Sequence, residues 1–271
     1  MTVDRREHIL TGLDLAGVGL EIGGGYNPVA AKDRYRVDHL DHADQAGLIA
    51  KYEAQGIDTS RIQYVDYVWS GQSYRELVGE KRYDWIVASH VIEHVPDPIH
   101  FLNDCAAILT DGGVLSLAVP DKRVCFDYYR PPTGLARLVD AFVRGDTHTT
   151  VGAVVEHHLY ASAADGVIAW DDAFEHGAPR FVHTVEQVRW LYEQMVHDRN
   201  AVAQSQDVHA WAFTPQSFRL VVEDLFQLGL IPLRERAWHD TQGYEFFVQL
   251  ARDGAGPDVD RATLARTALS A

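Results

Sequence analysis

Short apolar segments alternate with amphipathic ones through the first half of the chain. The apolar segments are rich in β-branched residues and have the length of buried strands; they are residues 18–22, 35–40, 62–68, 83–88 and 114–119. Two stretches between them, residues 46–54 and 98–109, have the apolar spacing of helices that cover a core. This alternation predicts an α/β fold, in which helices lie on both faces of a parallel sheet.

The pattern changes after Pro120, where helix and loop replace the alternation. At Thr214 and Pro215 a helix is predicted to begin, because the pair has the N-cap and first-position pattern. Residues 231–238 and 244–250 then predict an antiparallel hairpin at the edge of the sheet. The predicted units are a core of residues 1–119 and 215–252, a mainly helical inserted cap of residues 120–214 that binds substrate, and a flexible tail of residues 253–271. Residues 261–269 of the tail could form one helix.

Composition and charge indicate which partners and which cellular location to expect. The chain has 271 residues, of which 46% are hydrophobic and 23% charged, and its formal net charge is −15. This charge disfavours nucleic acid and membrane surfaces as partners. A charged start and the lack of a long apolar run predict a cytoplasmic protein. Cys105 and Cys125 are expected to be buried thiols and not a disulfide, and no oligomeric state follows from the sequence.

A glycine-rich turn follows the first predicted strand, in the run from Glu21 to Pro28. Its three consecutive glycines allow a sharp turn and a close approach to a ligand. Asn27 is expected to cap a helix whose first residue is Pro28. A dinucleotide-binding fingerprint would need a third glycine at position 28, so the turn predicts a nucleotide cradle that does not bind NAD.

Two runs carry a resemblance to a known family. The run Glu21-Ile22-Gly23-Gly24-Gly25 resembles the acidic-x-Gly-x-Gly motif of class I S-adenosylmethionine-dependent methyltransferases. Residues 83–95 are similar to the family's D-x-I-x-x-S-H-V-x-E-H-V run. The resemblance implies a Rossmann-like, seven-stranded sheet that is mostly parallel with an antiparallel last strand, and it implies S-adenosylmethionine as cofactor.

The same resemblance implies the cofactor-binding residues. They are Glu21, Gly23, Gly24, Gly25, Tyr26, Asn27, Asp38, Asp66, Tyr67, Ser89 and His90. Asp38 is expected to accept hydrogen bonds from the ribose hydroxyls, with Asp41 as the alternative. Asp66 is expected to contact the adenine amino group, with Tyr67 or Val68 over the ring; the alternative is that Asp66 is a solvated residue at a strand end.

The run His90-x-x-Glu93-His94 also fits a zinc-protease pattern. That pattern needs a long helix, whereas this run leaves a strand and meets Pro96 at once. Ubiquinone-pathway O-methyltransferases have a similar acidic run that can hold a divalent ion, but His90 stands here in place of the first acid. We therefore predict no metal, and an ion at His90, Glu93 and His94 stays the alternative.

Methyl transfer to oxygen needs a base that removes the acceptor's proton. Histidine suits this task near neutral pH, and the predicted cap is rich in it. His157 and His158, which follow Glu156, are the candidates from the cap, with His209 next; His90 is the candidate from the core. The resemblance implies O-methylation of a saccharide or small secondary metabolite, and the alternatives are a protein methyltransferase or a non-catalytic S-adenosylmethionine-binding regulatory protein.

Overall fold

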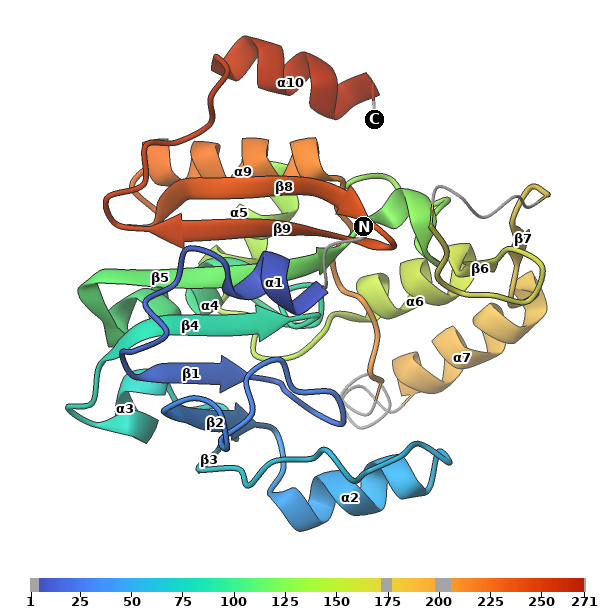
Figure 1. Cartoon of the computed structure of the whole chain (residues 1–271). Helices are drawn as coiled ribbons and strands as arrows, with labels where there is room; N and C mark the ends of the chain where they lie inside the picture. Colours follow the sequence, from blue (N-terminus) through green and yellow to red (C-terminus); the bar gives the residue numbers. More distant parts are fainter. Residues whose placement is uncertain (1–4, 172–176, 198–205, 271) are drawn as a thin grey trace.

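The computed structural model describes residues 5–171, 177–197 and 206–270. Its centre is a seven-stranded sheet (Figure 1). In spatial order the strands are β3 (Tyr67–Val68), β2 (Val37–Asp41), β1 (Gly19–Ile22), β4 (Tyr83–Ser89), β5 (Leu109–Pro120), β9 (Glu245–Ala251) and β8 (Arg234–Gln242). The first five are parallel, and β9 runs antiparallel to both of its neighbours. The predicted Rossmann-like sheet is therefore confirmed.

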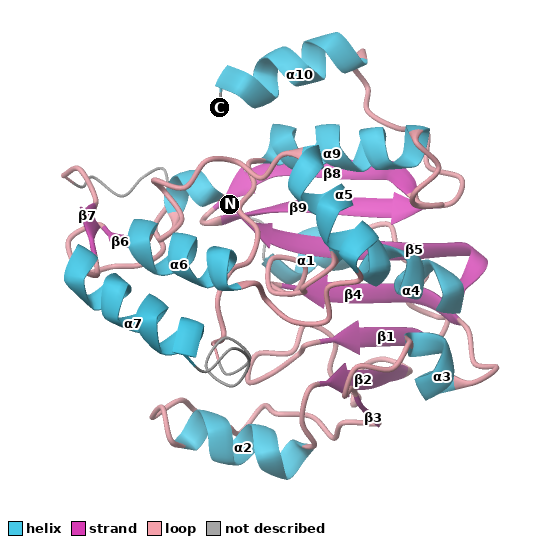
Figure 2. Cartoon of the chain, turned by 180° about the vertical axis from the view of Figure 1, so that it is seen from behind, coloured by secondary structure: helices cyan, strands magenta, loops and turns pink. Residues whose placement is uncertain are grey.

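Helices pack on both faces of the sheet, and its central strands are therefore buried on both sides. On one face lie α4 (Pro98–Ile108), α5 (Leu135–Arg144) and α9 (Pro215–Gln227), with α3 (Tyr74–Val78) against α4 (Figure 2). The short α1 (Arg5–Leu10) lies on the other face. Side chains of β4 alternate between the two cores: Ile86 packs on the α4 side, whereas Trp85 packs with Ile9 of α1.

The predicted cap region forms several elements. These are η1 (Lys122–Val124), α5, α6 (Val151–Tyr160), α7 (Val185–His197) and a small sheet of β6 (Ser162–Ala163) and β7 (Arg180–Phe181). Helix α5 packs on the core, where Leu138 and Ala141 are buried. The elements α6, α7, β6 and β7 lie beyond the carboxyl ends of the parallel strands (Figure 1). The division into a core and a substrate-binding cap stays a prediction. Helix α5, although it belongs to the predicted cap region, packs on the core.

Three local predictions were wrong. No helix follows Asn27, and residues 28–36 form turns before β2. Of the predicted strand 62–68, only Tyr67 and Val68 pair, and α2 (Gln45–Glu53) fills much of the connection before them. The end of the chain is not a loose tail, because α10 (Arg261–Ser270) packs on α9 and buries Leu264. In the described part of the chain, no helix is long and apolar enough to cross a membrane.

Candidate active site

A cavity of about 740 Å³ opens at the carboxyl ends of β1, β2 and β4. Ligands of open α/β sheets bind at this edge, where the chain's connections diverge to opposite sides, here between β1 and β4. Eight of the predicted cofactor residues line the cavity: Glu21, Gly23, Gly24, Gly25, Tyr26, Asn27, Ser89 and His90. Its size is that of an ordinary small-molecule or cofactor site.

The glycine turn cannot carry side chains at two positions. Gly23 has a φ of +68° and Gly25 a φ of +49°, both in the left-handed region. A Cβ on Gly23 would lie 2.7 Å from Val91 Cγ2, and one on Gly25 would lie 2.8 Å from Tyr52 Oη. The backbone of the turn is therefore free to approach a molecule in the cavity.

Glu21 explains why the chain turns after Asn27 without forming a helix. Its carboxylate is buried and accepts hydrogen bonds from the backbone N–H groups of Val29 (2.6 Å) and Ala30 (2.7 Å). These groups would otherwise need a helix cap. Burial raises the pKa of Glu21 to about 7, although the two hydrogen bonds act in the opposite direction. Glu21 thus holds the turn in place through these two hydrogen bonds.

The structure places Asp41 at the cavity, and not the preferred Asp38. Asp38 accepts hydrogen bonds from Tyr83 Oη (2.7 Å) and Lys81, at the amino end of the sheet, and does not line the cavity. Asp41 ends β2 at the carboxyl edge, lines the cavity and accepts a hydrogen bond from the Gly25 N–H (3.1 Å). Three residues of strand span about 10 Å, so only one of the two carboxylates can face a bound ligand.

Asp66 and Tyr67 also lie outside the cavity lining. The Asp66 carboxylate accepts hydrogen bonds from the His39 N–H (2.7 Å) and from Lys32, which hold it against β2. In this part of the chain, the residue that lines the cavity is Trp69, which follows β3 and supplies an indole ring. The structure thus places Asp66 and Tyr67 away from the cavity, whereas the ring of Trp69, two residues after Tyr67, lines it.

His90 stands at the end of β4 in a left-handed conformation, with a φ of +54°. This turns its ring toward β9, where His90 Nε2 lies 2.9 Å from Glu245 Oε2. Arg5 Nε donates to Glu245 Oε1 (2.5 Å), and the same guanidinium donates to Ser89 Oγ. Burial acts to raise the pKa of Glu245, but the hydrogen bonds from His90 and Arg5 outweigh it and lower that pKa.

His157 and His158 do not line the cavity, which corrects their placement as catalytic candidates. His157 packs its ring against Phe126 and His209, and burial lowers its pKa to about 3. His158 Nδ1 lies 3.3 Å from His183 Nε2. Both residues are on α6.

A histidine and carboxylate cluster borders the cavity instead. One potential ligand atom from each of Glu93, His94 and His209 lies within 4.8 Å of the other two. The backbone joins them, because the Ala210 N–H donates to the Glu93 carbonyl (2.8 Å). Asp127 Oδ2 lies 2.6 Å from His209 Nδ1. His94 is the member that also lines the cavity.

Asp127 is ionised within this buried cluster. Burial acts to raise the pKa of its carboxyl, but His209 and Arg130 outweigh this and lower that pKa to about 2. Arg130 is fully buried and also donates to Glu156 (3.0 Å). Its guanidinium supports the cluster and is not presented to a ligand. Asp127 carried no signal in the sequence that could have linked it to His209.

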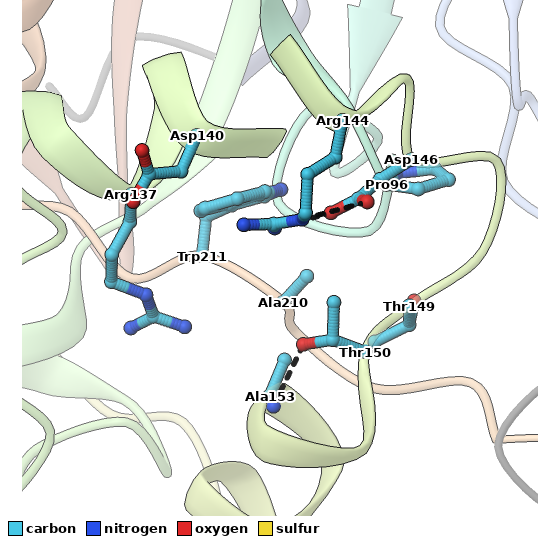
Figure 3. Close-up of a pocket in the computed structure, with 10 residues that line it drawn as sticks. All are labelled: Pro96, Arg137, Asp140, Arg144, Asp146, Thr149, Thr150, Ala153, Ala210 and Trp211. Atoms are coloured by element: carbon cyan, nitrogen blue, oxygen red, sulfur yellow. Dashed lines mark hydrogen bonds and ion pairs between the residues drawn. The ribbon is translucent and has the colours of Figure 1, made fainter. Parts of the chain in front are cut away.

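A second, smaller recess of about 180 Å³ adjoins the cavity, and Pro96 and Asp146 line both (Figure 3). It lies between α5, the start of α6 and Trp211. Arg144 donates to Asp146 (2.6 Å), and Thr150 Oγ1 accepts from the Ala153 N–H. The recess therefore offers charged and hydroxyl groups beside an indole ring.

Comparison with known proteins places these features among methyltransferases. Residues 4–195 match a family described as a methyltransferase domain. A ubiquinone biosynthesis O-methyltransferase of Xanthomonas euvesicatoria pv. vesicatoria (strain 85-10) is 32% identical over 124 residues, which are 44% of this chain and 49% of that protein. The chain thus spans about half the length of the curated relatives it matches.

Two solved structures show similarity at low sequence identity. The CcbJ methyltransferase of Streptomyces caelestis is 13% identical, with a TM-score of 0.45, over 91% of this chain and 94% of that one. The mitomycin 7-O-methyltransferase MmcR is 12% identical, with a TM-score of 0.39, over 88% of this chain and 49% of that one.

Proposed function

The chain belongs to the methyltransferase-domain family, as a class I protein whose cofactor is S-adenosylmethionine, and we propose that it methylates an oxygen of a small hydroxylated molecule. The observation that carries this proposal is the position of His90. Its imidazole lines the cavity at the end of β4 and is oriented by Glu245. Such a carboxylate-held histidine is suited to removing a hydroxyl proton.

The residues of the cavity fit the cofactor. The glycine turn leaves its backbone uncovered, as a close approach by the ligand requires. Asp41 presents a carboxylate to the cavity, suited to the ribose hydroxyls, and Trp69 presents an aromatic ring suited to the adenine. When bound there, the cofactor supplies a methyl group on a positively charged sulfur.

The proposal assigns one tautomer to His90. A carboxylate at Glu245 accepts a hydrogen bond from His90 Nε2, which then carries the proton. The lone pair of His90 Nδ1, which lies 3.5 Å from Glu93 Oε1, would then take the acceptor's hydroxyl proton. With S-adenosylmethionine held in the cavity, the deprotonated oxygen would displace sulfur from the methyl carbon, and the electron pair of the carbon–sulfur bond would leave with sulfur. The reaction gives the methyl ether and S-adenosylhomocysteine.

The acceptor we propose is a saccharide or a small secondary metabolite. The recess beside the cavity supports this, because Arg144, Asp146 and Thr150 offer the hydrogen bonds that a polar, hydroxylated ring requires. The name of the curated relatives, which are O-methyltransferases, favours oxygen as the accepting atom. Protein and regulatory functions are the alternatives that an assay must separate.

The test is a screen of sugars, sugar nucleotides and phenols for release of S-adenosylhomocysteine. On an active acceptor, His90→Gln should lower kcat by about a hundredfold or more, the usual contribution of a general base. Cofactor affinity should stay within about threefold, since His90 is not proposed to hold the ribose. His148→Gln, at an exposed position, is the matched control. Cofactor binding without turnover on any acceptor would favour the regulatory alternative.

A further inference from the structure

We propose that Glu93, His94 and His209 form a binding site for a divalent transition-metal ion. Glu93 Oε1 lies 3.9 Å from His94 Nε2 and 3.9 Å from His209 Nε2. The two imidazole rings are perpendicular, with centroids 4.7 Å apart. Three donors from two distant segments of the chain therefore converge on one point. The sequence had led us to expect no metal.

The carboxylate of Glu93 is the strongest evidence. The residue is only 1% exposed, and neither oxygen accepts a hydrogen bond from any residue that the structure describes. The nearest side-chain nitrogens, at 3.5 to 3.9 Å, are too distant for one. A buried carboxylate without partners is strongly unfavourable. A cation between Glu93 and the two imidazoles would remove that cost.

His209 is oriented as a metal ligand usually is, because its Nδ1 lies 2.6 Å from Asp127 Oδ2. His94 Nδ1 lies 3.0 Å from Asp207 Oδ1 but makes no hydrogen bond with it. A carboxylate on one ring nitrogen fixes the tautomer and leaves the other nitrogen's lone pair for an ion. In His209 the nitrogen so left is Nε2, which lies 3.9 Å from Glu93 Oε1, and His94 Nε2 lies at the same distance from that oxygen.

His90 is not part of the proposed ligand set. Its Nδ1 lies 3.5 Å from Glu93 Oε1, but the group of donor atoms that lie within 4.8 Å of one another comprises only Glu93, His94 and His209. The Nε2 of His90 is already held by Glu245 of β9. The third ligand is instead His209, which lies in the segment leading into α9 and is buried beside Glu93. The site thus links the turn after β4 to a segment more than a hundred residues later, which no run of adjacent residues indicates.

The donor set defines the class of ion. Two imidazoles and one carboxylate suit zinc, iron or another first-row divalent ion better than magnesium or calcium. Donors around a tetrahedral zinc ion lie about 3.4 Å apart, whereas these three lie within 4.8 Å of one another, so the side chains would have to move inward around the ion. Three protein ligands leave a coordination position open. Since His94 also lines the cavity, the ion would border it, and any role toward the acceptor rests on the proposed function.

The test measures ion binding directly, without cofactor or acceptor. Purified protein is stripped with a chelator, dialysed, and titrated with Zn²⁺ by calorimetry; Co²⁺ serves as a second probe through its visible absorption. We expect one ion per chain. Glu93→Gln and His209→Gln should each weaken binding by a hundredfold or more and abolish the Co²⁺ bands. Asp127→Asn should weaken it by about ten- to a hundredfold.

Two matched controls locate the site. His90→Gln should bind within about threefold of wild type, because His90 is not a ligand. His158→Gln removes one member of the other close histidine pair and should have equally little effect. Circular dichroism checks that each variant folds, and if His209→Gln does not, the isosteric Glu93→Gln decides.

The proposal is wrong if stripped wild-type protein binds neither ion. It is also wrong if binding is lost in His158→Gln and kept in Glu93→Gln. Because no methyl donor is present, a negative methyl-transfer assay would not change either result, and the two proposals can fail separately.

Discussion

Replacing Asp41 by asparagine should selectively weaken cofactor binding. The Asp41 carboxylate already accepts three hydrogen bonds from the chain: from the Gly25 N–H (3.1 Å), the His42 N–H (2.8 Å) and His42 Nδ1 (2.6 Å). An ionised carboxylate has about four acceptor positions, so one remains for a ribose hydroxyl. A hydrogen bond to a charged group contributes about 1.5–3 kcal/mol, which corresponds to a Kd raised by about 10- to 150-fold.

Asparagine is chosen because its amide oxygen can still accept the Gly25 N–H, so the glycine turn should remain in place. The matched control is Asp38→Asn, which changes a carboxylate on the same strand outside the cavity. Calorimetric titration with S-adenosylmethionine and with S-adenosylhomocysteine measures both variants. We expect Asp38→Asn to leave the Kd within about threefold.

The opposite result would refute the placement of the ribose. If Asp38→Asn weakens binding and Asp41→Asn does not, the cofactor does not use the carboxyl end of β2. If both variants bind normally while retaining native circular dichroism, neither carboxylate contacts the ribose, and the orientation inferred for the cofactor is wrong.

Three further predictions concern stability. Burial lowers the pKa of His39 to about 4, so the folded state binds fewer protons than the unfolded chain between pH 4 and 6.5. Up to about 3 kcal/mol of unfolding free energy should therefore be lost as pH falls through this window, and urea titrations of His39→Gln should show a flatter pH profile, unlike those of the exposed control His148→Gln. Glu235→Ala should lower the unfolding free energy by about 1.5–3 kcal/mol, because the buried Arg219 loses its bidentate partner but keeps Asp258 at 2.7 Å; an unchanged denaturation midpoint would contradict this. Glu21→Ala should lower the melting temperature and weaken cofactor binding together, since the Val29 and Ala30 N–H groups lose their acceptor; a calorimetric Kd equal to that of wild type would show that Glu21 does not fix the turn.

The sequence by itself determined the fold class and the cofactor turn. Alternation of apolar strands with amphipathic helices is a local pattern, because each element must bury its own apolar face. The run Gly23-Gly24-Gly25 is local as well, since two of its positions require a left-handed backbone. These signals are complete within short windows of the chain, and the structure has the predicted sheet around them.

Tertiary structure decided which polar side chains face the cavity. Asp38 and Asp41 are both acidic residues of one strand, and only the register of β2 against β1 shows which of them reaches the carboxyl edge. The absent helix after Asn27 likewise depends on the buried carboxylate of Glu21, because an acceptor from the core can replace the helix cap. A residue's type does not specify the end of the sheet at which it lies.

The sequence indicates even less about which residues meet in the clusters beside the cavity. Glu245 lies 155 residues from His90, and Asp127 lies 82 residues from His209, yet each pair is in hydrogen-bond contact. No periodic pattern links such residues, since their approach depends on the antiparallel insertion of β9 and on the path of the chain into α9. The sequence therefore determined the architecture and the turn that holds the cofactor, whereas the partners of each histidine were decided by contacts that form only once the sheet is assembled.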